Sequence, residues 1–342
     1  MTRSSRRSAA AVTIRSVAER AGVSAMTVSH TLNGTKNVRP ETREAVLRAV
    51  EELGYVPNTA ARSLASAQAS RVGIVYRNAS NAFLSAMLVG ALNAASRAGA
   101  QVILRKCDAP TVEQALDAVD KLKKGGANAI LLAPPYDDLL AGHAGFAGLN
   151  LPAVAMACDR PLPGMDSIGI DEKAAAATAT RHLLARGHRR IGFVMGPATH
   201  SVSRVRFEGY GAALAEAGLA IDPALVALGD FTFDSGLTAA DVLLAAATPP
   251  TAILASNDDM AAGVIAQAHR RGLRMPADLA VVGIDDAPIA VKIWPPLTTI
   301  RQDVEAMAEA ATRRLIERQR GIISGPAEAL RMPFELVVRE SA

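Results

Sequence analysis

TIRSVAERAGVSAMTVSHTLNGTKNV, residues 13–38, is the stretch that decides the fold of the first part of the chain. Within it, Ala18 stands where two helices must approach closely, Gly22 permits a tight turn, and Val28 can pack the second helix onto the first. A small residue, a turn residue and a packing residue at these spacings predict a helix-turn-helix.

The surrounding residues complete a three-helix unit. Thr13 and Ser24 can cap the first two helices, because each stands just before a run with helical apolar spacing. A third helix is expected from about Pro40, a favoured first-turn residue, with Gly54 after its end. We therefore expect a small all-α unit with a minimal core.

Charge separates this part of the chain from the rest. Residues 1–71 carry 11 Lys and Arg against 5 Asp and Glu, a net charge of +6, and the remainder carries 26 against 28, a net charge of −2. A small basic module on a nearly neutral body suggests that one end of the protein meets a polyanion. With 342 residues, two or three compact units are expected.

After residue 70, short β-branched runs alternate with helical segments, as in βαβ units and parallel sheets. The runs are VGIVY, QVIL, AILLA, AVAMA, RIGFVM, TAILAS and LAVVGI, and the helices are expected at 86–98, 111–123, 205–217 and 259–271. The pattern also repeats, because VGIV at Val72 and IGFV at Ile191 are 119 residues apart, as are similar segments beginning at Gly90 and Gly209. Two Rossmann-like lobes with a ligand cleft between them are predicted.

The composition argues against several other classes. Cys107 and Cys158 are the only cysteines and lack metal-ligand spacing, so we expect neither a disulfide framework nor a metal site. Arg15 and Glu19 interrupt the apolar run that follows the basic start, and they leave it too short for a signal peptide. The longest stretch without Asp, Glu, Lys or Arg, 139–158, contains several glycines and is interpreted as a loop before a buried strand. A cytoplasmic protein without membrane contact is expected.

The joined motifs AGVS, TVS, LNG, ELGYVPN and ARSL resemble the headpiece of the LacI/GalR (lactose-repressor) family. RGHRRIGF, RFEGY, GDF, NDDMAAG, GIDD and PPLTTIRQ extend the resemblance more loosely along the chain. It implies a DNA-binding transcription regulator that acts as a repressor, with a two-lobed, periplasmic-binding-protein-like α/β effector domain. It also implies a homodimer on a palindromic operator in double-stranded DNA, controlled by a small molecule.

The resemblance assigns the second helix to the major groove. Ala25 and Met26 then offer base edges only apolar contact, and His30 replaces a frequent arginine, so no operator sequence is predicted. Hydroxyl and amide side chains nearby match phosphate-contacting positions, with helix capping or a solvated surface as the alternative. The residues assigned to DNA binding are Ala25, Met26, Thr27, Ser29, His30, Asn33, Thr42, Asn58, Arg62 and Leu64.

The segment NTAARSLAS, 58–66, has one strongly apolar side chain, Leu64. In the family this segment forms a hinge helix when two subunits lie side by side on DNA, and Leu64 occupies the position of a leucine that wedges into a minor-groove step. Anchoring of the linker to the body is the alternative. Purine-responsive members have a lysine at the position of Ala65, so one minor-groove contact of those members is not expected here.

Polar residues follow three predicted strands: Asp171, Asn257 and Asp285. The carboxyl ends of these strands should bring them to the cleft, where carboxylates, an amide, an arginine and aromatic rings suit a neutral polyhydroxyl ligand. A sugar or glycoside is therefore the preferred effector. With the positions that the resemblance adds, the expected effector residues are Phe83, Asp171, Arg206, Phe231, Asn257 and Asp285.

Structural roles remain open for several of these residues. Asp285 can equally cap a helix, Phe231 can belong to the core, and Arg206 can pair with Glu208. The adjacent acids Asp258 and Asp286 are interpreted as structural. His200 and Val202 stand where a purine-responsive relative has polar residues that recognise the base. This difference argues against a nucleobase effector.

An enzyme and a sugar receptor without DNA-binding activity are the alternative functions. The sequence has no phosphate-binding loop, no G-x-S-x-G and no HExxH, so no catalytic residues and no cofactor are expected. The expected organisation is a headpiece at 1–57 with 1–12 disordered, a hinge at 58–68, and an effector and dimerisation domain at 69–342, whose N-terminal lobe comprises about 70–170 and 301–330 and whose C-terminal lobe comprises about 171–300 and 331–342.

Overall fold

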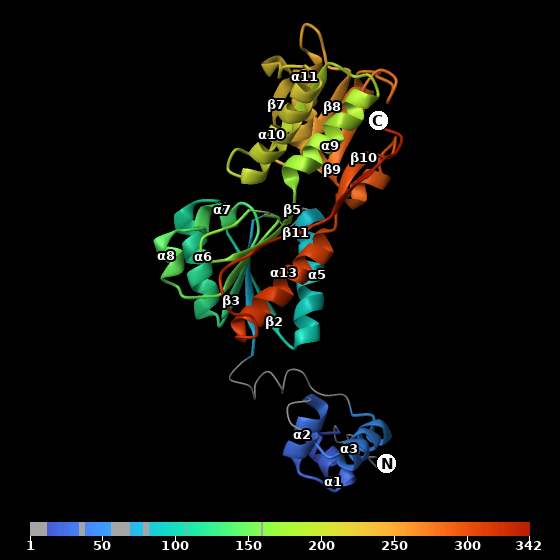
Figure 1. Cartoon of the computed structure of the whole chain (residues 1–342). Helices are drawn as coiled ribbons and strands as arrows, with labels where there is room; N and C mark the ends of the chain where they lie inside the picture. Colours follow the sequence, from blue (N-terminus) through green and yellow to red (C-terminus); the bar gives the residue numbers. More distant parts are fainter. Residues whose placement is uncertain (1–11, 34–37, 56–68, 78–81, 108, 159) are drawn as a thin grey trace, which may run out of the picture. The chain divides into compact units, whose positions relative to one another are not determined.

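The computed structural model describes residues 12–33, 38–55, 69–77, 82–107, 109–158 and 160–342. The chain divides into two compact units, 1–67 and 68–342 (Figure 1). The first unit contains α1 (Ile14–Ala21), α2 (Ala25–Asn33) and α3 (Pro40–Leu53). The second unit contains two parallel α/β lobes.

The first unit forms as the sequence predicts, a helix-turn-helix followed by a third helix. Thr13 and Ser16 form a capping box at the start of α1, and Gly22, at φ 67°, ends it in the left-handed conformation that glycine adopts without strain. A small buried cluster that includes Val17 and Val28 joins the helices. The expected packing of α2 on α1 is confirmed.

The N-lobe of the second unit is built on a six-stranded sheet with the order β11-β5-β4-β3-β1-β2, in which every pair is parallel. Its strands are β1 (Arg71–Tyr76), β2 (Gln101–Lys106), β3 (Ala129–Leu132), β4 (Ala153–Met156), β5 (Asp166–Ile170) and β11 (Ala329–Met332). Its helices are α5 (Ala82–Ala98), α6 (Val112–Lys124), α7 (Tyr136–Leu140), α8 (Ala144–Ala147) and α13 (Val304–Gln319).

The C-lobe repeats this design on a sheet with the order β12-β10-β9-β8-β6-β7, parallel except for the β10–β12 pair. Its strands are β6 (Ile191–Met195), β7 (Val226–Leu228), β8 (Ala252–Ala255), β9 (Ala280–Asp285), β10 (Thr298–Gln302) and β12 (Phe334–Val337). Its helices are α9 (Glu172–Ala185), α10 (Ser201–Glu216), α11 (Phe233–Leu244), α12 (Asp258–Arg270) and the 3-10 turns η1 (Pro223–Leu225) and η2 (Pro288–Val291).

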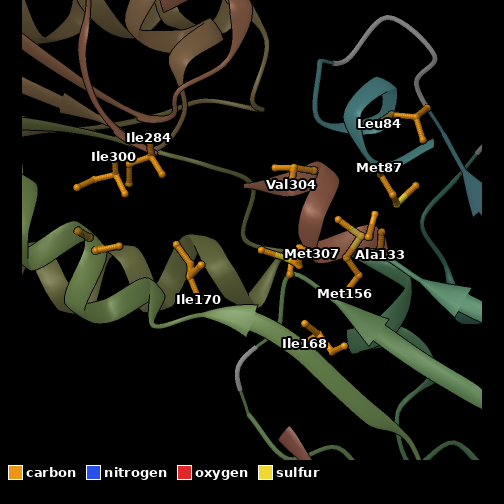
Figure 2. Close-up of a cluster of buried hydrophobic side chains, with 14 of the residues drawn as sticks. Leu84, Met87, Ala133, Met156, Ile168, Ile170, Ile284, Ile300, Val304 and Met307 are labelled. Carbon is orange, nitrogen blue, oxygen red and sulfur yellow. The ribbon is translucent and has the colours of Figure 1, made fainter. Parts of the chain in front are cut away.

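The chain crosses between the lobes after β5, β10 and β11. The second and third crossings come two residues later than the sequence suggested, because β10 continues through Gln302 and β11 through Met332. One buried apolar cluster includes residues of both sheets, and Figure 2 shows Val304, just after a crossing, among them. The lobes therefore share a core at the crossings.

The two glycines that mark the sequence repeat have equivalent structural roles. A side chain at Gly90 of α5 would collide with the Glu305 carbonyl of α13, and one at Gly209 of α10 would collide with the Lys173 carbonyl of α9. Each lobe thus has a helix pair whose backbones touch, which only glycine permits at these positions.

Candidate functional site: a reading helix and an interlobe cleft

The helix assigned to the major groove, α2, begins with a side-chain cap. Ser24 Oγ accepts a hydrogen bond from Thr27 N at 3.1 Å and lies 2.9 Å from Thr27 Oγ1. Met26 is 69% exposed, whereas Ala25 packs against the headpiece core and His30 is half-buried. Met26 is therefore the most accessible of the three residues expected to face base edges.

The other residues expected at DNA lie partly beyond what the structure describes. Ser29 on α2 and Thr42 on α3 are half-buried. Their assignments to phosphate contacts remain predictions, as does the wedge role of the hinge leucine. Outside the described part of the chain lie the Asn33 side chain and the hinge residues Asn58, Arg62 and Leu64.

Between the lobes, beyond the carboxyl ends of the strands, lies a cavity of about 90 Å³. It adjoins a larger one of about 820 Å³, with which it shares Phe83, Pro134, His200 and Phe231. The residues that line the smaller cavity are Phe83, Pro134, Ala157, Glu172, His200, Val202, Arg206, Phe231, Asn257, Asp285 and Gln302.

Arg206 is buried, and its guanidinium is held by a carboxylate that the sequence pattern did not indicate. Arg206 Nε and Nη2 donate to the two carboxylate oxygens of Glu172 at 2.7 and 3.1 Å, and Nη1 donates to the Ser256 carbonyl. Asp285 Oδ1 lies 3.9 Å from Nη2. The suggested pairing with Glu208 is wrong, because Glu208 pairs with another arginine on the outer face of α10.

Asp285 stands at the end of β9, and its side chain is only 16% exposed. Its Oδ1 accepts a hydrogen bond from Gln302 Nε2 at 2.6 Å, and it caps no helix. Burial raises the pKa of Asp285 to about 6, although Arg206 and Gln302 partly offset this effect. The alternative that Asp285 is a helix cap is therefore wrong.

Asn257 and Phe231 also line the smaller cavity. Asn257 Oδ1 caps α12 by accepting from Met260 N at 3.0 Å, and its Nδ2 donates to the Phe231 carbonyl at 3.1 Å. The Phe231 ring meets His200 edge to face at a centroid distance of 5.4 Å. Burial lowers the pKa of His200 to about 4, so this ring is neutral at pH 7.

Backbone strain is concentrated around the same cavity. Phe231, Asp285 and Ala157 have φ values of 68°, 126° and 57°, in the region that side chains other than glycine rarely adopt. Strained backbone of this kind persists where the surrounding structure enforces it, and it is frequent at ligand sites. The strain therefore supports a ligand-binding role for the cavity.

Asp171 is the one expected effector residue that does not line the cavity. It caps α9 by accepting from Ala174 N at 2.9 Å, and its other oxygen lies 3.3 Å from Arg331 Nη1. The next residue, Glu172, points into the cleft instead. Gln302 is also a cleft residue without an earlier assignment, and its position directly after the β-branched run of β10 is the signal that could have indicated it.

Asp258 and Asp286 have structural roles, although not as helix caps. Asp258 accepts hydrogen bonds from Thr299 Oγ1 at 2.6 Å and from Ala287 N at 2.7 Å. Asp286 pairs with Arg301 and with a second arginine near the chain end. These contacts fix the loop that directly follows Asp285, the last residue of β9.

A helix-turn-helix unit joined to a two-lobed unit with an interlobe cavity defines a class: ligand-responsive, DNA-binding transcription regulators. Residues 13–58 match the family described as bacterial regulatory proteins, lacI family, and residues 180–342 match a periplasmic binding protein-like domain. The HTH-type transcriptional regulator CelR of Thermobifida fusca is 34% identical over 341 residues, covering 96% of this chain and 98% of CelR. This chain belongs to the LacI family, as its motifs predicted.

Solved structures of the family superpose along nearly the whole chain. A transcriptional regulator CelR–cellobiose complex has a TM-score of 0.72 at 31% identity and covers 97% of this chain and 100% of that one. A lac repressor dimer bound to operator and the anti-inducer ONPF has a TM-score of 0.75 at 31% identity, and the match covers 97% of this chain and 99% of that one. The curated relatives are transcriptional regulators. Among the described residues, no helix is long and apolar enough to cross a membrane.

Proposed function

We propose that the effector of this regulator is a neutral carbohydrate or glycoside that binds in the interlobe cavity. The proposal rests on the charge balance of the cleft, where Glu172 already neutralises Arg206 and Asp285 adds a further carboxylate. Arg206 is the one Lys or Arg among the described residues that line the smaller cavity, and it is already paired, so an anionic ligand finds no further Lys or Arg there, whereas hydroxyl groups can donate to the carboxylates. The relative solved with cellobiose supports this ligand class.

The aromatic side chains fit the same ligand. Phe83 comes from the N-lobe and Phe231 from the C-lobe, and both line the two adjoining cavities. Apolar rings can cover the C–H faces of a sugar while the polar groups bind its hydroxyls. Because His200 is neutral, it adds no cation that would favour a phosphate or carboxylate.

We also infer that the protein binds a palindromic operator as a homodimer in the cytoplasm, where its DNA target lies. One helix-turn-helix reads only a half-site, and a two-fold symmetric dimer matches a palindrome. The lac repressor, solved as a dimer bound to operator, is similar along its whole length.

Helix α13 offers a physical connection from the cleft to the start of the second unit. It begins next to Gln302, which donates to Asp285, and it ends at Gln319, whose Oε1 accepts from Ser70 Oγ at 2.6 Å. Arg320 Nε donates to the same hydroxyl at 3.0 Å. Ser70 directly precedes β1 and follows the hinge segment in the sequence. A change at the cleft can therefore reach the linker through one rigid element.

A thermal-shift screen over monosaccharides, disaccharides, glycosides and purines tests the effector class. We expect a saccharide to raise the melting temperature in proportion to the logarithm of its concentration, because it binds only the folded protein. Asp285→Asn should abolish that shift, and Asp117→Asn, at an exposed position on α6, should retain it. Stabilisation by purines alone would refute the carbohydrate proposal.

A further inference from the structure

Helix α10 takes its N-terminal cap from the other lobe. Its N-cap residue, His200, makes no side-chain hydrogen bond to the helix. Instead, Ser201 N donates to Asp138 Oδ2 at 2.8 Å, and Asp138 belongs to α7 of the N-lobe. A carboxylate at a helix N-terminus accepts a charge-assisted hydrogen bond and is favoured by the helix dipole. This hydrogen bond joins the N-lobe to the C-lobe.

The Asp138 side chain is held in place for this contact. It is 17% exposed, and its Oδ1 pairs with Arg160, which follows β4 in the same lobe. Its neighbour Asp137 is buried, and burial together with the charge of Asp138 raises the pKa of Asp137 to about 7. A fixed carboxylate with an arginine partner loses little side-chain entropy when it caps a helix.

The contact lies at the edge of the cleft, away from the crossings. Figure 1 shows α7 and α10 toward the left of the second unit, whereas β5 and β11, which lead into crossings, are labelled to their right. The residue before Ser201, His200, lines both cavities, and Arg206 follows on the same helix. Pro135 and Tyr136, close to Asp138, also line the larger cavity, so the bond joins the two lobes at the rim of the cleft.

We propose that Asp138 is an interlobe clasp, a positioning residue that holds the lobes together across the cleft by capping α10. The crossings hold the lobes on one side, and the clasp limits their separation on the other. The clasp also fixes the first turn of α10 and with it the positions of His200 and Arg206. Releasing it should let the lobes separate.

The test measures the distance between the lobes in the full chain without ligand. Spin labels at Glu113→Cys on α6 and Ala215→Cys on α10 report the separation, since both positions are exposed and both native cysteines are buried. Labelled chain is diluted with unlabelled chain so that only distances within one subunit are measured. Asp138→Ala should replace the single short distance by a longer and broader distribution.

Three further variants separate the clasp from a general loss of structure. Asp138→Asn keeps an acceptor oxygen for Ser201 N and should retain most of the short distance, and Arg160→Met should give an intermediate result. Asp117→Ala removes an exposed carboxylate that pairs with Lys121 within α6 and should leave the distance unchanged.

An Asp138→Ala distribution identical to those of the wild type and Asp117→Ala would overturn the proposal. If Asp138→Ala fails to fold, the Arg160→Met result decides, because an unchanged distance there would also overturn it. These distances need neither effector nor operator, so they test the clasp separately from the proposed effector class.

Discussion

Carboxylates with little or no solvent exposure outnumber the one buried arginine at the smaller cavity. Glu172, Asp258 and Asp285 lie near one buried arginine, Arg206. Burial raises the pKa of Asp258 well above its ordinary value, and the charge of Asp285 raises it further. Excess buried charge destabilises the folded protein unless a ligand supplies hydrogen-bond donors. The site is therefore expected to gain stability when it is filled.

Asp285→Asn should stabilise the ligand-free protein at neutral pH. Because the pKa of Asp285 is about 6 when folded, against 3.8 ordinarily, the folded state holds this proton more tightly, and stability falls as pH rises from about 4 to 6. Removing the charge should recover on the order of 1–3 kcal/mol at pH 7 and almost nothing at pH 4. Urea unfolding of both proteins at the two pH values measures this, and an equal effect at both would contradict it.

The sequence could not show which of two adjacent acidic residues at the end of a strand faces the cleft. Asp285 and Asn257 were expected from their positions after β9 and β8, and both line the cavity. Asp171 was expected on the same reasoning, but the chain turns at the end of β5 so that Asp171 caps α9 and Glu172 enters the cleft. Sequence spacing alone does not distinguish two adjacent acids.

At the level of secondary structure, each lobe is organised around a pair of closely packed helices. The sequence predicted α5, α6, α10 and α12 but not α9, α11 or α13 as separate helices. Helix α9 is rich in alanine and buried along much of its length, so it has no clear apolar stripe. The repeated glycine segments were visible in the sequence, whereas their role as contacts between helix backbones required the structure.

Gly90→Ala should weaken the α5–α13 pair. The added methyl group would overlap the Glu305 carbonyl and come within 2.9 Å of Ala308 Cβ, so the helices must move apart. We expect a loss of roughly 1–3 kcal/mol in unfolding free energy, typical of overpacking. Ser96→Ala, at an exposed position on the same helix, should have almost no effect. Similar stability of both variants would show that the contact is unimportant.

Arg320→Met tests whether α13 transmits the effector signal. It removes the hydrogen bonds to Ser70 Oγ at 3.0 Å and to the Ala98 carbonyl at 2.7 Å but leaves the cleft residues untouched. We expect the affinity for the stabilising saccharide, measured by calorimetry, to stay within a few-fold, while the saccharide-dependent change in DNA affinity decreases. Full retention of that change would show that the Arg320–Ser70 hydrogen bond is not needed, because the hydrogen bond from Ser70 Oγ to Gln319 Oε1 remains in this variant.

At the scale of the whole molecule, the protein separates DNA recognition from ligand recognition. The basic segment 1–71 contains the helix-turn-helix, and the nearly neutral remainder contains the cleft. Family membership, the helix-turn-helix and the two-lobed fold were all predictable because short motifs and strand–helix alternation determine them. The operator sequence was not, because Ala25 and Met26 offer few groups that distinguish base pairs.

Leu64→Ala tests the predicted minor-groove wedge. If Leu64 enters a base step, the variant should lose much more affinity for the operator than for unrelated DNA, because only the specific complex contains the kinked step. Titrations on both DNAs at one salt concentration measure the two losses. Equal losses would favour the alternative that Leu64 anchors the linker.

The most direct test is a mobility-shift titration on a palindromic site from the protein's own upstream region, with and without the saccharide that stabilises the protein. We expect a salt-dependent shift whose midpoint changes several-fold with saccharide, and Asp285→Asn should retain the shift but lose the change. The absence of both a shift and salt-dependent retention on any DNA would contradict the account.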